Sequence, residues 1–138
     1  LTDGLRSVLQ TIDAEELIES TVRWPGHIDM YLKKKEELSE EDLVRAWSWD
    51  TNRPEFTWME VYARGKGNST WILDDNGDEK GSSMARTTGA ITCAVVKFLI
   101  KEKGIYGVHP PENFGHDLLE MCLNEYSKNN IKINEIKN

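Results

Sequence analysis

The sequence predicts an α+β fold: a mixed, mostly antiparallel sheet with helices packed on one face, including one long buried helix. Three observations predict it. Two β-prone runs, 55–63 and 69–73, flank a glycine-containing turn and form the clearest hairpin in the chain. A long run, 82–103, is apolar over a wide arc at helical spacing. The segment 131–136 alternates apolar and polar side chains, which is typical of an edge strand.

The amino-terminal segment predicts helix, then strand. Residues 1–19 carry an apolar face at helical spacing, with Thr2 or Asp3 as a cap and a second short turn at 13–18. That face consists of Leu5, Val8, Leu9 and Ile12. The segment 20–24 is β-prone and stops at a Pro-Gly pair, which predicts a strand that ends in a turn.

Further helices are predicted on both sides of the hairpin. Residues 27–47 predict two helices, and Ser39 with Asp42 forms a capping box at the start of the second. Residues 114–128 predict another amphipathic helix. With 138 residues in total, a single domain, 1–138, is the natural expectation.

The charge balance excludes several classes of partner. Asp and Glu together number 24 against 17 Lys and Arg, which gives a formal net charge of −7. Nucleic acids and anionic membranes favour clustered basic residues, so we expect neither as a partner. We see no apolar run of the ~20 residues that a membrane span requires. Cys93 and Cys122 lie in apolar helical context without a CxxC spacing, which predicts buried free thiols in a reducing, cytoplasmic setting.

Motifs that superficially resemble ligand loops fail on their spacing. The glycines at 65–67 lead into a strand, whereas a dinucleotide loop leads into a helix. The acidic positions at 74–78 lack the glycine and the glutamate of a calcium loop. His27, His109 and His116 form no metal-binding pair. We therefore expect no metal site.

Two segments carry candidate binding chemistry. The segment 21–27 places Arg23, an aromatic ring and His27 around one tight turn; a structural strand end with an exposed arginine is the alternative. The segment 82–89 places hydroxyl residues and Arg86 at the start of the long helix. A helix amino terminus suits a carboxylate or phosphate, and an arginine can add a bidentate contact. Capping alone explains the serines, but not the Arg-Thr-Thr-Gly that follows.

The chain resembles the C-terminal domain of the saccharopine dehydrogenase family, which includes saccharopine reductases and lysine ε-dehydrogenases. Four segments carry the resemblance in collinear order: TDGLR at 2–6, TVRWPGH at 21–27, SSMARTTG at 82–89 and GVHPPE at 107–112. The middle of the chain, 30–80, matches in outline. Family members commonly have an aromatic residue and Pro after the glycine of the third segment, whereas this chain has Ala-Ile-Thr. The cleft wall therefore differs from the common form, and the resemblance leaves the substrate open between saccharopine and a lysine-like amino acid.

The resemblance implies a two-part enzyme in which a Rossmann domain binds NAD or NADP. The second domain binds an amino-acid substrate, saccharopine or lysine-like, and forms the dimer, and hydride exchange occurs at a carbon–nitrogen bond. By this resemblance, Arg23 and Arg86 bind substrate carboxylates over one shared hollow. Thr87 and Thr88 line the cleft, and His27 is the candidate for catalytic proton transfer.

This chain contains no dinucleotide fingerprint and begins with Leu1 rather than Met. We expect it to be the C-terminal part of a larger oxidoreductase, without its Rossmann domain, with no cofactor bound by this chain and no turnover alone. A homodimer is expected because five Trp and a hairpin leave an apolar face uncovered. One rival is a stand-alone, non-catalytic binding or dimerisation module, with its arginines apart and exposed. The other, a small enzyme of another class, lacks the nucleophile–base pair or metal cluster it would need.

Overall fold

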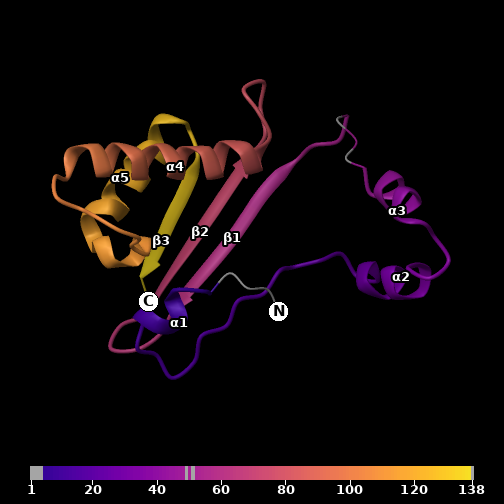
Figure 1. Ribbon diagram of the computed structural model, residues 1–138, viewed down its shortest axis with the longest axis horizontal. Helices are drawn as coiled ribbons and strands as arrows, with labels where there is room; N and C mark the ends of the chain where they lie inside the picture. Colours follow the sequence, from indigo (N-terminus) through magenta and orange to yellow (C-terminus); the bar gives the residue numbers. More distant parts are fainter. Residues whose placement is uncertain (1–4, 49, 51, 138) are drawn as a thin grey trace. The chain divides into compact units, whose positions relative to one another are not determined.

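A computed structural model describes residues 5–48, 50 and 52–137. The chain divides into two compact units, Leu1–Asn52 and Arg53–Asn138, and each is described by itself. The predicted α+β class is confirmed: the chain combines helices with one three-stranded antiparallel sheet (Figure 1).

In its described residues, the first unit contains three short helices, α1 (Val8–Thr11), α2 (His27–Lys34) and α3 (Glu40–Ala46). The two predicted helices of 27–47 are confirmed. The Ser39 half of the capping box is confirmed as well, because its hydroxyl oxygen accepts a hydrogen bond from the Asp42 amide at 3.2 Å. The Asp42 carboxylate accepts a hydrogen bond from the Ser39 hydroxyl at 2.7 Å, so the reciprocal half of the box, a bond to the Ser39 amide, is not confirmed.

Other predictions for the first unit are wrong. The helix predicted over 1–19 is reduced to α1, and its candidate caps Thr2 and Asp3 lie outside the described residues. Residues 13–18 form no helical turn, and 20–24 form no strand. A β-prone segment becomes a strand only where another strand pairs with it, and in the described residues none pairs with 20–24.

The second unit is built on the sheet. Its strands are β1 (Phe56–Ala63), β2 (Ser69–Asn76) and β3 (Lys132–Lys137), in the order β1-β2-β3. Both neighbouring pairs are antiparallel. The predicted hairpin and the predicted last strand are thus confirmed, with β2 extending to Asn76 beyond its predicted end at Leu73.

Two helices cover one face of this sheet. They are α4 (Ser83–Lys101) and α5 (Gly115–Lys128), and the 3₁₀ turn η1 (Pro111–Phe114) leads into α5. In Figure 1, α5 lies beside β3, and β1 forms the sheet edge away from α5. The buried core of the unit joins the sheet to both helices. It consists of Leu73, Ala90, Tyr126 and Ile131, with Ile91 and Ile133 packed against it.

Helix α4 buries a single stripe, at helical spacing: Ser83, Thr87, Ala90, Ala94 and Phe98. Residues off this stripe, such as Val96 and Ile100, are exposed. By length and hydropathy alone α4 could cross a membrane, a test that core helices of soluble proteins also pass. Cys93 lies off the stripe and is exposed, so the prediction of a buried thiol is wrong there; Cys122 is half-buried, which raises the pKa of its thiol.

Candidate functional site

The first candidate segment forms a tight turn that leads into α2. Gly26 has φ 81° and ψ −7°, and the His27 amide donates to the Trp24 carbonyl at 3.1 Å. Proline followed by a glycine in this conformation defines a type II turn, which a residue with a side chain would strain. The turn leaves Arg23 and Trp24 exposed.

The imidazole of His27 is oriented by aromatic stacking. Its ring lies 5.5 Å from the Trp47 ring with an interplanar angle of 20°, and Tyr31 contacts the same indole at 5.6 Å. Trp47 therefore packs against both rings, which lie one helical turn apart on α2. Within the described residues, the side chains of Arg23 and His27 have no hydrogen-bonding or ionic partner, so both remain available to a ligand.

The second candidate segment opens α4, and its arginine is engaged by acids of this chain. Arg86 donates to both carboxylate oxygens of Asp75, from Nε at 3.2 Å and from Nη2 at 3.1 Å. Nη1 pairs with Asp78, and Nη2 also donates to the Asn129 carbonyl at 3.0 Å. The guanidinium thus ties together the end of β2, the following loop, α4 and the end of α5.

The two acids around Arg86 differ in burial. The side chain of Asp75 is 3 % exposed, that of Arg86 is 11 % exposed, and that of Asp78 is 40 % exposed. The hydrogen bonds that Arg86 donates to Asp75 raise the pKa of Arg86, with a smaller contribution from its contact with Asp78. The pKa of the Asp78 carboxyl is lowered, first by the Lys80 amide and then by Arg86. Asp75 is therefore the fixed partner and Asp78 the exchangeable one.

The amino terminus of α4, predicted to suit an external anion, is contacted by Glu55. Its carboxylate accepts hydrogen bonds from the Ser83 amide at 2.5 Å and the Met84 amide at 3.2 Å. Gly77 permits this approach, because a Cβ at that position would lie 2.8 Å from the Glu55 carboxylate. Two of the free amides that make a helix start attractive to anions are thus satisfied internally.

The two threonines after Arg86 have different surroundings. Thr87 is buried, and its hydroxyl donates to the Ser83 carbonyl at 2.9 Å. Thr88 is exposed, and its hydroxyl donates to the Met84 carbonyl at 2.6 Å. Both hydroxyl groups bond back onto the helix, as Thr commonly does inside helices. Only Thr88 presents its side chain at the surface.

The structure gathers Arg86, Thr87 and Thr88 at the start of α4, whereas Arg23 and His27 belong to the other unit. Their convergence over one hollow remains a prediction. Sequence reasoning missed Asp75 and Glu55 as partners at this helix start. A signal was present for Asp75: it follows Leu73 by two residues, so it lies on the strand face that packs against the helices. A carboxylate on such a face needs a buried cation.

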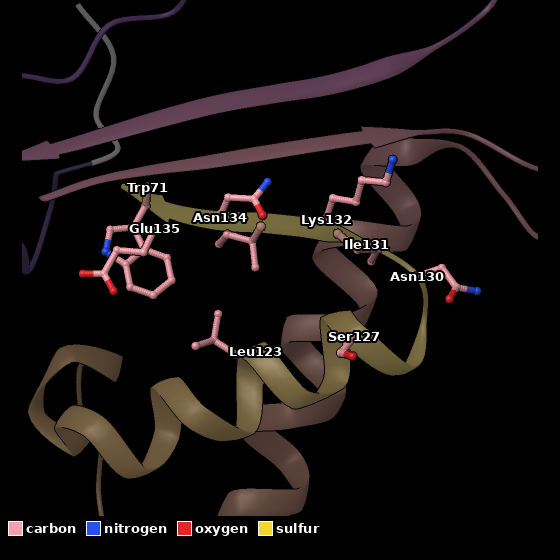
Figure 2. Close-up of a pocket in the computed structure, with 9 residues that line it drawn as sticks. Trp71, Leu123, Ser127, Asn130, Ile131, Lys132, Asn134 and Glu135 are labelled. Carbon is pink, nitrogen blue, oxygen red and sulfur yellow. The ribbon is translucent and has the colours of Figure 1, made fainter. Parts of the chain in front are cut away.

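An open groove of about 530 Å³ lies elsewhere in the second unit, between β3 and α5. Figure 2 shows Trp71 and Leu123 extending into the space between the sheet and α5. None of the sequence-predicted site residues lines it. Glu135 on its wall is already bonded to Ser69 at 2.8 Å and paired with Lys137 at 3.3 Å. The groove therefore has an apolar floor with polar walls and offers no evident reactive group.

Among the described residues, no group of three or more His, Cys, Asp or Glu side chains could hold a metal ion. Comparison with known proteins adds no relative: no family model, no curated protein and no solved structure matches the chain.

Proposed function

We propose that this chain is the substrate-binding and dimerisation domain of an NAD(P)-dependent oxidoreductase that acts on the carbon–nitrogen bond of an amino-acid substrate, saccharopine or lysine-like. The observation that carries the proposal is the collinear order of four motifs, three of which contain an arginine: Arg6, Arg23 and Arg86. Arginine suits the planar carboxylates of such a substrate better than lysine, because its guanidinium presents paired donors. The α+β fold with a long helix is in keeping with the role.

Arg23 is the cation best placed to receive a substrate carboxylate. It is exposed, and it precedes a type II turn whose proline and glycine restrict the backbone. His27 lies at the end of the same turn with its ring held by Trp47. An imidazole can both accept and donate a proton, so His27 could exchange a proton with the substrate amine while Arg23 holds its carboxylate.

Arg86 could bind the substrate only if a substrate carboxylate replaced one of its two carboxylate partners. A substrate carboxylate would replace the half-exposed Asp78, while the buried Asp75 keeps its bidentate contact. Thr88, exposed in the same helical turn, would then lie beside the ligand. The nicotinamide, bound by a separate Rossmann domain, would supply the hydride chemistry, and the residues of this chain would bind and orient the substrate.

A second candidate function is a stand-alone, non-catalytic binding or dimerisation module. One observation favours it: the two anion-attracting features at the start of α4 are already neutralised within the chain. Glu55 contacts the helix amides, and Asp75 and Asp78 contact Arg86. In that case Arg86 has a purely structural role.

Titration calorimetry of the chain with saccharopine and with lysine separates the two candidates. We expect saturable binding of at least one of them, lost in Arg23→Ala. The matched control is Arg45→Ala, which removes another arginine of the same unit whose side chain is 78 % exposed. Retained binding in that variant would show that a general loss of positive charge is not the cause. No saturable binding, or equal loss in both variants, would favour the non-catalytic module.

A further inference from the structure

The two edges of the sheet differ in chemistry. Strand β3 carries Lys132, Glu135 and Lys137 among its six residues. Strand β1, of eight residues, carries one charged residue, Glu60. Charged side chains on an edge strand discourage pairing with another chain, because a second strand would have to accommodate them. Only the β3 edge has this protection.

Strand β1 is also apolar and exposed on both faces. On the face without helices, Phe56 is 60 %, Trp58 51 % and Tyr62 61 % exposed. Met59 pairs with the buried Leu73, so it lies on the helix-covered face, yet it is 46 % exposed; Val61, on the same face, is 49 % exposed. In the described part of the chain the sheet ends at β1, so its outer backbone groups pair with no further strand. A long apolar edge of this kind is a site for strand addition.

We infer that β1 pairs antiparallel with β1 of a second copy of this chain, joining two three-stranded sheets into one continuous sheet across a two-fold axis. This inference rests on the dimerisation part of the proposed function and names the surface that performs it. A two-fold interface requires a self-complementary surface, and the sequence of β1 provides one.

The register follows from the side chains of β1. With Met59 opposite Met59 of the second copy, Phe56 lies opposite Tyr62, Thr57 opposite Val61, and Trp58 opposite Glu60. Aromatic and β-branched cross-strand pairs of this kind stabilise sheets. Registers centred on Met59 or on Glu60 pair the most residues of β1, 56–62 or 57–63. Centring on Glu60 would place Glu60 against Glu60, and like charges directly opposite are unfavourable. Strand overlap and the single charge of β1 together therefore favour the register with Met59 on the axis.

A second copy is favoured over an unrelated strand because β1 offers no charge pattern for a foreign partner to match. Its one carboxylate is also engaged, since a hydrogen bond from Tyr62 to Glu60 raises the pKa of the tyrosine. The remaining basis for recognition is the apolar surface of β1, which is complementary to the same surface of a second copy.

Light scattering coupled to size-exclusion chromatography tests the interface on the whole chain. Met59→Lys would place two ammonium groups together on the axis. Because juxtaposed like charges cost several kcal/mol, we expect the dimer dissociation constant to rise about a hundredfold or more, giving a monomer. Ile136→Lys is the matched control: it adds the same charge at the other edge, on a side chain that is also 46 % exposed, and should remain a dimer. Circular dichroism verifies that both variants are folded.

Cysteine cross-linking tests the register and does not depend on a destabilising change. In a chain whose Cys93 and Cys122 are replaced by Ser, Met59→Cys should form a disulfide-linked dimer on mild oxidation. Phe56→Cys should not, because its copy would lie about 20 Å away along the strands. A wild-type monomer would overturn both the dimerisation and this interface. A dimer that survives Met59→Lys, or equal cross-linking of the two cysteine variants, would overturn the interface alone, and calorimetry reports on substrate binding separately.

Discussion

The two units of the chain contrast in what they bury. Among the described residues of the first unit none is buried, and its large apolar side chains lie open: Val22 is 82 %, Trp24 81 % and Ile18 65 % exposed. The second unit encloses a core in which Leu73 is 2 % and Phe98 5 % exposed. Burial of apolar surface is the main favourable term in folding. The second unit therefore carries most of the stability, and the apolar residues of the first contribute little to it.

The largest expected change in the free energy of unfolding comes from a substitution that creates a cavity in the core of the second unit. Phe98 is buried on the inner stripe of α4 and contacts the Phe114 ring at 5.2 Å. Phe98→Ala should lower the free energy of unfolding by about 3–5 kcal/mol, measured by urea denaturation. Ile18→Ala, at an exposed position of the first unit, should change it by less than about 0.5 kcal/mol. Equal losses would show that the first unit has a core of its own.

A slightly smaller effect is expected at the ion pair that ties the second unit together. Arg86→Met leaves Asp75 buried without its cation, which should cost about 3 kcal/mol in the same measurement. The control is Lys97→Met, because the Lys97 side chain is 52 % exposed in its pair with Glu125 and should contribute under about 1 kcal/mol. A comparable loss in the two variants would contradict a structural role for Arg86.

The smallest expected effect is on how the free energy of unfolding depends on pH. The pKa of Asp78 is lowered in the folded chain, by the Lys80 amide first and by Arg86 second. A carboxyl with a lowered folded pKa contributes stability above its unfolded pKa, near 4, and loses that contribution as the pH falls through the folded value. Asp78→Asn should therefore be less stable than wild type at pH 7, and the gap should close below about pH 4. Denaturation curves at several pH values would show it; a gap independent of pH would contradict the assignment.

Where signals are local, the sequence predicted the structure. The glycine turn at 65–67, the Ser39 cap and the helical period of 82–103 each stabilise an element through neighbours in the chain, and each element was found. The strand predicted at 20–24 was wrong because a strand depends on a partner that propensity cannot supply. The burial of Cys93 was misjudged because α4 is covered on one stripe only.

The candidate site likewise has one part that depends on neighbouring residues and one part that depends on contacts between distant segments. The type II turn at Pro25-Gly26 follows from two adjacent residues whose backbone preferences fix it. The environment of Arg86 could not be predicted from its own segment. Its partners lie 11 residues away at Asp75 and 43 away at Asn129, brought together by the packing of α4 and α5 on the sheet.

By itself the sequence determined the fold class, the hairpin, the long helix and the tight turn before α2, because backbone preferences and hydrophobic periodicity act between near neighbours. Only the tertiary structure decided that the carboxylates of Asp75 and Glu55 meet the start of α4, and that β1 and not β3 is the unprotected edge. Ion pairs and sheet edges arise from segments far apart in the chain, so their chemistry exists only once the core has formed.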